Sequence, residues 1–200
     1  MRALAIALLL AGCSSAQHAV DGGAACEASS YPCGPFGFAQ GARIANLTID
    51  GQRDANHSGS AVDDPVAPIQ LADYFADPKL SMLAIIIGAE SCVPCQNEQP
   101  NLVTLYDNYL PGGKVAFLEA IVQNASGQPA DQTVIDNWAT RYNLPFDISH
   151  DPTQALAPYY PVNTFPSAMA IRLADMTIVY QVTGPATGLQ SAIDSNLQSR

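Results

Sequence analysis

The order of apolar and polar positions along the chain predicts strands that alternate with helices. The clearest strand is the apolar run at residues 83–87, which is rich in branched side chains and is closed by Gly88. A run of four to eight such residues is typical of a strand buried on both faces. Residues 69–75 predict a short strand or turn followed by a helical turn. Further strands are predicted at 44–50 (ended by Gly51), 115–122, 146–148, 168–173 and 177–183.

Apolar residues at helical spacing predict helices between these strands, at 96–109, 131–142, 153–160 and 187–198. Asp131 and Asp151 are expected to cap the second and third helices, because a carboxylate accepts hydrogen bonds from free N–H groups at a helix start. Pro100 lies inside the first helix and is expected to kink it. The order β-α-β-α-β-α-β-β-α predicts an α/β domain with a mixed central sheet flanked by helices. Parallel strands come first and an antiparallel hairpin closes the sheet.

The N-terminus predicts a secretory signal. Residues 3–11 form an apolar stretch behind Arg2 that is too short to span a bilayer. It runs into Leu10-Ala11-Gly12-Cys13, which resembles the bacterial lipoprotein box, so we expect removal of residues 1–12 and lipidation of Cys13. An ordinary secreted signal with an incidental Cys is the alternative. Ser rather than Asp follows Cys13, which by resemblance to enterobacterial sorting favours the periplasmic side of the outer membrane.

The length and the charge of the chain indicate one acidic domain with a tail. The chain has 200 residues, 48% of them hydrophobic, and a formal net charge of −10. We assign residues 13–45, rich in Ala, Gly, Ser and Pro, to a lipidated tether and an irregular N-terminal extension, and residues 46–200 to the folded domain. The acidic balance argues against nucleic acid as a partner and against a basic face for anionic lipid.

The cysteines beyond Cys13 predict two local pairs. Cys92-Val93-Pro94-Cys95 follows the strand at 83–87 and stands at a predicted helix start. Free backbone N–H groups and the helix dipole would stabilise a Cys92 thiolate there, and Cys95 could resolve a mixed disulfide formed at Cys92. Of three possible pairings we prefer Cys26–Cys33 as a structural disulfide beside Cys92–Cys95. The alternative makes Cys26 and Cys33 a second redox or metal pair.

These features resemble the membrane-anchored TlpA/ResA-type thiol-disulfide oxidoreductases of the thioredoxin fold, over roughly residues 46–198. The resemblance rests on the Cys-x-x-Cys-x-x-Glu-x-Pro pattern from Cys92 to Pro100 and on Thr164-Phe165-Pro166-Ser167 before the closing hairpin. It implies that Glu98 helps to move a proton at the buried Cys. It also implies that Pro166 has a cis peptide bond and packs against the Cys pair, and that the backbone at Phe165 binds substrate. Ser91 departs from the pattern, because the family commonly has Trp there.

The resemblance further implies a thiol-disulfide oxidoreductase of the bacterial cell envelope, with Cys92 as nucleophile and Cys95 as resolving residue. Its partners would be protein or small-molecule disulfides, an upstream thiol donor, and the membrane through the lipid anchor. No metal is implied, and no cofactor beyond the redox-active disulfide Cys92–Cys95. The direction of electron flow stays open.

Three other functions remain in view. A peroxidase is disfavoured, because Ile85 and Ala89 stand where peroxiredoxins place Pro and Thr before the reactive Cys. A Sco-like copper protein would use Cys-x-x-x-Cys, which is one residue longer, together with a distant His, for which His150 is the candidate. A non-catalytic binding module would keep Cys92–Cys95 as a permanent structural disulfide.

Overall fold

The computed structural model describes residues 31–54, 59–60 and 63–197. The predicted signal, Cys13 and Cys26 lie outside these residues. Within the described part, no helix is long and apolar enough to cross a membrane.

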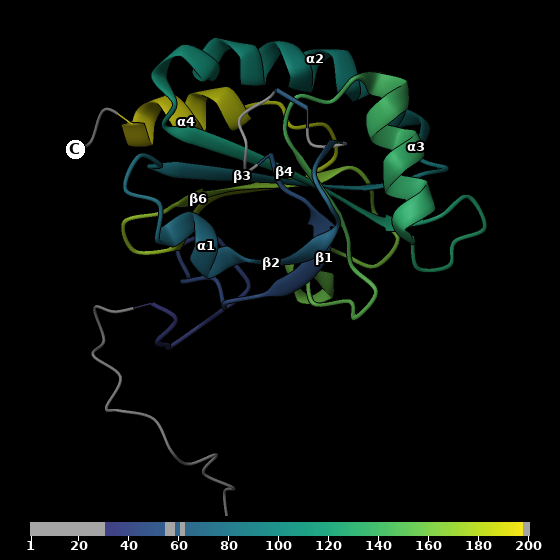
Figure 1. Cartoon of the computed structure of the whole chain (residues 1–200). Coiled ribbons are helices and arrows are strands. Elements are labelled where there is room, and N and C mark those ends of the chain that lie inside the picture. Colours follow the sequence, from purple (N-terminus) through teal and green to yellow (C-terminus); the bar gives the residue numbers. More distant parts are fainter. Residues whose placement is uncertain (1–30, 55–58, 61–62, 198–200) are drawn as a thin grey trace, which may run out of the picture.

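A seven-stranded mixed sheet with the order β2-β1-β5-β4-β3-β6-β7 forms the centre of the fold (Figure 1). Neighbours β3, β4 and β5 are parallel, while β6 and β7 form an antiparallel hairpin beside β3. The predicted mixed sheet with its closing hairpin is therefore confirmed. The expectation that parallel strands come first was wrong, because β1 pairs antiparallel with both β2 and β5. The strands are β1 Thr48–Gln52, β2 Ala67–Gln70, β3 Met82–Ala89, β4 Val115–Gln123, β5 Asp147–His150, β6 Ser167–Arg172 and β7 Thr177–Thr183.

In the part of the chain that the structure describes, four α-helices accompany the sheet: α1 Leu71–Phe75, α2 Val93–Tyr109, α3 Gln132–Tyr142 and α4 Leu189–Leu197. Asp131 caps α3 as predicted, because its side chain accepts a hydrogen bond from the N–H of Val134. Pro100 lies inside α2, as expected. Short 3-10 turns at Leu110–Gly112 and Ala157–Tyr159 follow α2 and precede β6.

The sheet separates two hydrophobic cores, and β3 contributes to both because successive side chains of a strand point to opposite faces. Leu83, Ile85 and Ile87 pack on the face covered by α1 and the N-terminal segment. Ala84 and Ile86 pack on the face covered by α2, α3 and α4 (Figure 1). Every residue of β3 is buried. Burial of each of its large aliphatic side chains contributes about 1.5–3 kcal/mol to the hydrophobic stabilisation of the fold.

The prediction that Gly51 ends the first strand was wrong. Gly51 lies inside β1 and pairs with Ser149 of β5. A Cβ atom at Gly51 would lie 2.3 Å from the carbonyl oxygen of Ile148 and 2.7 Å from the Cβ of Ser149. Glycine is therefore required there by the close approach of β5, and β1 begins at Thr48 rather than at residue 44.

The predicted helix at residues 153–160 was also wrong. The chain makes turns there, with Gln154 at a φ of +57°, and ends in the 3-10 turn Ala157–Tyr159. Asp151 does accept hydrogen bonds from backbone N–H groups, those of Ala155 at 2.9 Å and Leu156 at 2.7 Å. Its carboxylate thus holds a compact turn rather than the start of a helix.

Residues 41–44 extend the sheet beyond β7. The N–H of Gly41 donates to the carbonyl oxygen of Ile178 at 2.8 Å, and the N–H of Ile44 donates to that of Met176 at 2.9 Å. Ile44 is fully buried. This pairing lies N-terminal to the domain boundary expected at residue 46, so the folded unit includes part of the N-terminal extension.

Candidate redox site

Strand β3 leads directly to the cysteine pair. The N–H of Cys92 donates to the carbonyl oxygen of Ala89 at 3.0 Å and closes a turn, after which Cys92 is the N-cap residue of α2. Pro94 lies in the first two positions of this helix, where the missing N–H of proline costs no intrahelical hydrogen bond. A disulfide joins Cys92 to Cys95, with an S–S distance of 2.07 Å.

The two sulfur atoms of this disulfide differ in their surroundings. Cys95 is 2% exposed, whereas Cys92 is only partly buried. The Sγ of Cys92 accepts a hydrogen bond from the backbone N–H of Cys95 at 3.1 Å. The positive end of the α2 dipole lies at the same place, so a thiolate at Cys92 would be both stabilised and reachable from outside.

The loop before β6 brings Phe165 and Pro166 to the same end of the sheet. The Phe165–Pro166 peptide bond is cis, as the resemblance implies. The next residue, Ser167, pairs with Ile87 of β3. A Cβ atom at Gly88, the following residue of β3, would lie 3.6 Å from the Sγ of Cys95. The buried Pro166 and Cys95 therefore both lie at the C-terminal end of β3.

Glu98 connects α2 to the loop between β7 and α4. One carboxylate oxygen, Oε1, accepts a hydrogen bond from the N–H of Ala186. The other, Oε2, is buried and has no hydrogen-bond partner. Burial raises the pKa of Glu98 above its ordinary value, against the lowering effect of the Ala186 hydrogen bond. Part of the Glu98 carboxylate is thus engaged in holding a loop.

A second carboxyl group, which the sequence analysis did not select, lies beneath α2. Glu119 is fully buried in β4, and its Oε1 accepts a hydrogen bond from the Nε2 of Gln99 at 2.7 Å. The same Nε2 donates to the carbonyl oxygen of Cys95 at 3.2 Å. Burial raises the pKa of Glu119 to about 8, although the hydrogen bond from Gln99 and the nearby indole N–H of Trp138 lower it. An acidic residue inside the apolar run 115–122 was the signal in the sequence.

Unpaired polar atoms surround Glu119. Its own Oε2, the Oε1 of Gln99 and the Oε2 of Glu98 are buried without a hydrogen-bond partner, and so is the Nε1 of Trp138, the indole N–H that lies near Glu119 and lowers its pKa. The charge of Glu98 also raises the pKa of Glu119, so the two carboxyl groups interact electrostatically. A buried unpaired acceptor costs about 1–3 kcal/mol, and a protonated carboxyl group gains a donor that can relieve part of this cost. The cluster can therefore hold a proton next to Gln99, which lies one helical turn from Cys95.

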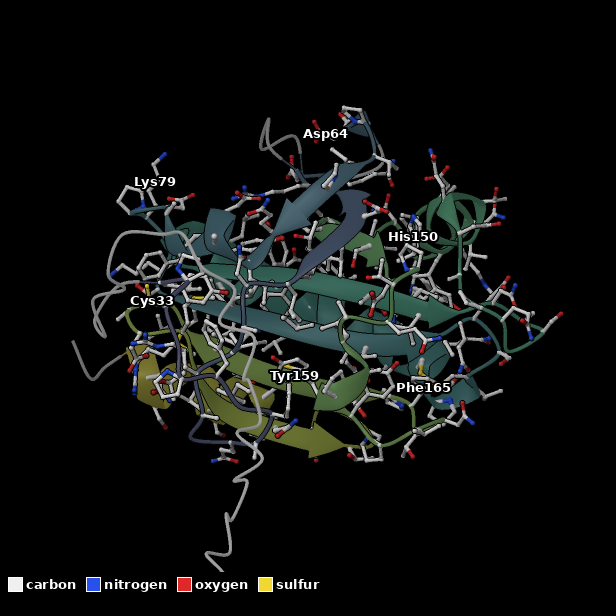
Figure 2. All side chains as sticks on the ribbon, turned by 90° about the horizontal axis from the view of Figure 1, so that it is seen from below. Cys33, Asp64, Lys79, His150, Tyr159 and Phe165 are labelled. Atoms are coloured by element: carbon white, nitrogen blue, oxygen red, sulfur yellow. A yellow bond between two sulfur atoms is a disulfide. The ribbon has the colours of Figure 1, made fainter. Side chains whose placement is uncertain are left out.

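His150 lies at the C-terminal end of β5, opposite Asp50 of β1, and its Nδ1 is buried without a hydrogen-bond partner. Figure 2 shows His150 and Phe165 at the same end of the strands. No group of three or more His, Cys, Asp and Glu side chains in the described part of the chain could hold a metal ion. The described residues thus give the copper hypothesis no support.

Cys33 is disulfide-bonded, and Figure 2 shows it at the end of the molecule opposite Phe165. Its predicted partner, Cys26, lies outside the described residues, so the Cys26–Cys33 pairing stays a prediction. The carbonyl oxygen of Cys33 accepts a hydrogen bond from the Nη1 of Arg43 at 2.8 Å, which ties this end of the N-terminal segment to the fold.

Solved structures of low sequence identity share this fold. The pneumococcal exposed lipoprotein thioredoxin of Streptococcus pneumoniae is 19% identical, with a TM-score of 0.54, covering 78% of this chain and 100% of that chain. StoA of Bacillus subtilis is 16% identical, with a TM-score of 0.51 and coverage of 74% and 98%. The reduced 2-Cys peroxiredoxin of Plasmodium vivax is 10% identical, with a TM-score of 0.58 and coverage of 80% and 84%.

Neither a protein-family model nor a curated relative matches the sequence. The similar solved structures show that the chain has a thioredoxin-like fold, as the sequence resemblance predicts, and they include a lipoprotein thioredoxin. Because a peroxidase shares the same fold, the chemistry has to be argued from the site itself.

Proposed function

We propose that this thioredoxin-fold protein is a thiol-disulfide oxidoreductase, with Cys92 as the nucleophile and Cys95 as the resolving residue. The observation that carries the proposal is the disulfide at the start of α2, in which Cys92 is partly exposed and Cys95 is buried. An attacking thiol needs access and a stabilised thiolate, whereas a resolving thiol needs only to reach its neighbour.

The reducing direction runs as two exchanges. The Cys92 thiolate attacks one sulfur of a substrate disulfide, and the other substrate sulfur leaves as a thiolate that takes up a proton. The Cys95 thiol then loses its proton and attacks the Sγ of Cys92, which releases the second substrate sulfur and forms the disulfide seen in the structure. Two electrons pass from the protein to the substrate, and an upstream dithiol reduces Cys92–Cys95 again. The same steps in reverse oxidise a substrate dithiol.

The buried Cys95 thiol needs a proton acceptor in the second exchange. In our proposal the carboxyl pair Glu98 and Glu119 serves this need. Glu119 is linked to the backbone of Cys95 through Gln99, and each carboxyl group keeps one unpaired buried oxygen. The proton-transfer role expected of Glu98 is thus shared by two residues in our proposal. Phe165 and Pro166 remain the proposed contact for the substrate backbone.

The cellular setting is proposed from the sequence. Residues 1–12 would be removed, and lipidated Cys13 would hold the protein in the cell envelope, on the periplasmic side of the outer membrane. A disulfide at Cys33 fits an oxidising compartment, which supports this setting and the structural role of Cys26–Cys33. Disulfide-containing proteins and a thiol donor would be the partners.

The test is the equilibrium of Cys92–Cys95 with glutathione buffers, followed by thiol trapping, with Cys92→Ser identifying which pair responds. A midpoint potential of about −270 mV would indicate an electron-delivering reductase, and one of about −120 mV would indicate an oxidant. A Cys92–Cys95 disulfide that does not exchange with glutathione or dithiothreitol under native conditions would overturn the proposal and leave a binding module.

A further inference from the structure

A second feature of the redox end is a pocket of about 180 Å³ between two loops. One wall comes from the end of β4 and the loop to α3, with Val122, Gln123 and Pro129. The other comes from the connection between β5 and β6, with Ala157, Tyr160 and Val162. The volume suits one large side chain.

The walls of this pocket are held by specific contacts. The Nε2 of Gln123 donates to the Oδ1 of Asn163 at 2.9 Å and joins the two loops across the mouth. Asn163 and Gln154 both line the pocket with positive φ angles of 55° and 57°. Non-glycine residues rarely adopt this conformation, and it gathers at sites where the surroundings impose it for binding. The pocket is thus a shaped feature and not a gap between loose loops.

Most groups that line the interior are uncharged. Its one acidic lining residue, Asp151, has both carboxylate oxygens engaged by the N–H groups of Ala155 and Leu156. Val122 is buried at its base, and Val162 at the rim is 83% exposed. No Lys or Arg lines this described pocket. A ligand group that is apolar and uncharged would fit it, whereas a carboxylate would find no cation.

The pocket adjoins the reactive disulfide. Gln123 pairs with Ala89, the last residue of β3, and the N–H of Glu90 donates to the carbonyl oxygen of Gln123 at 2.9 Å. Because neighbouring strands lie about 4.8 Å apart, the pocket begins one strand away from the turn that carries Cys92. On its other side the ring of Tyr160 lies 5.5 Å from that of Phe165. A chain segment bound at Phe165 therefore passes the pocket mouth.

We propose that this pocket binds one apolar side chain of a polypeptide substrate, close in sequence to the cystine that Cys92 attacks. The inference rests on the proposed oxidoreductase function and narrows its substrate to polypeptide disulfides with an uncharged, apolar neighbour. Glutathione disulfide, which carries carboxylates near its sulfur atoms, would be recognised poorly.

The experiment compares two short peptides, each closed by one cystine and differing in the residue beside it, Leu in one and Lys in the other. The reduced full-length chain is mixed with each peptide, and the second-order rate constant of the single exchange is measured by thiol trapping. We expect the Leu peptide to react about tenfold faster, since one apolar contact in a pocket gives discrimination of that order. Val162→Asp should lower the Leu-to-Lys ratio to about one or below, because it places a charge at the rim.

Leu110→Asp is the matched control. Leu110 is also an exposed aliphatic residue, at 55%, but it follows the C-terminal end of the 17-residue α2, about 25 Å from Cys92. Its variant should keep the wild-type ratio. Equal rates for the two peptides in the wild type, or a ratio that Val162→Asp leaves unchanged, would overturn the inference. Exchange of the wild type with dithiothreitol separates the two proposals. A protein that exchanges with dithiothreitol but does not discriminate between the two peptides would support the oxidoreductase function and overturn the proposed role of the pocket.

Discussion

At Glu119, stability and the proposed chemistry make opposite demands on one buried carboxyl group. An ionised carboxylate in a fully buried position is unfavourable, so the folded protein binds its proton more tightly than the unfolded chain does. Asp147 behaves in the same way, because burial raises its pKa to about 6 against the lowering effect of its hydrogen bond from Tyr74. Both groups make the folded state the more protonated one at mildly acid pH.

We expect the free energy of unfolding to fall as the pH rises. Burial raises the pKa of Glu119 from 4.5 to about 8, so between these values the folded state holds a proton that the unfolded chain has released. Stability is then fully present at low pH and is lost as the pH approaches about 8, by at most about 1.4 kcal/mol per pH unit for one group. Urea unfolding across this range measures the slope.

Glu119→Gln should flatten this dependence and be the more stable protein at about pH 8, because the amide stays neutral and can still accept the hydrogen bond from Gln99. Asp147→Asn provides the comparison, with an effect expected at lower pH because the pKa of Asp147 is about 6. Parallel curves for the wild type and Glu119→Gln would contradict the assignment of the slope to Glu119.

The same substitution should slow the release of substrate from the mixed disulfide. Loss of a positioned proton acceptor typically lowers a rate by about a hundredfold or more, so Glu119→Gln should accumulate the Cys92 mixed disulfide. Glu98→Gln is the paired measurement, in which rapid quenching and mass analysis follow the intermediate. Slow release in Glu98→Gln together with normal release in Glu119→Gln would return the role to Glu98 alone.

Close packing of β1 against β5 depends on the absence of a side chain at Gly51. Gly51→Ala would force its Cβ against the backbone of Ile148, which cannot move without disturbing the β1–β5 ladder. We expect a loss of about 1–3 kcal/mol in unfolding free energy, measured by urea denaturation. Gly112→Ala is the control, since a Cβ there meets nothing within 4 Å. Equal stability of the two variants would contradict this account of β1.

At the scale of elements, local patterns predict those pieces whose cause is local. The apolar run of β3, the Asp131 cap of α3 and the cysteine pair at the start of α2 were all readable from neighbouring residues. Gly51 was misread because a glycine that ends a strand and one that admits a neighbouring strand look alike in sequence. The helix predicted at 153–160 was wrong because an Asp side chain can accept the same backbone hydrogen bonds at a helix start and in a turn. Here Asp151 accepts them in a turn.

The site was predictable to the same extent. Cys92, Cys95, Phe165 and Pro166 belong to compact motifs, and the structure places them at one end of β3. The link from Glu119 to Cys95 passes through Gln99 and joins residues that are far apart in sequence, so only the folded chain reveals it.

At the scale of the whole molecule, the disulfide at Cys33 and the Cys92–Cys95 pair lie at opposite ends of the sheet. With the proposed partner Cys26, which would close a short loop, Cys33→Ser should lower the unfolding free energy by about 2–3 kcal/mol. The midpoint potential of Cys92–Cys95 should stay at the wild-type value in glutathione buffers. A shifted potential in this variant would show that the two ends are coupled.

The pairing of residues 41–44 with β7 also has a mechanical consequence. Tension applied at the N-terminus, where Cys13 would fasten the protein to a membrane, reaches the fold at the buried Tyr31, whose ring packs against that of Phe75, and then at the hydrogen bonds of Gly41 and Ile44 to Ile178 and Met176. The hydrogen bonds share the load at the edge of the sheet, several strands away from β4 with its Glu119. The protein can thus be pulled and reoriented on its tether while the geometry around Cys92 and Cys95 stays undisturbed.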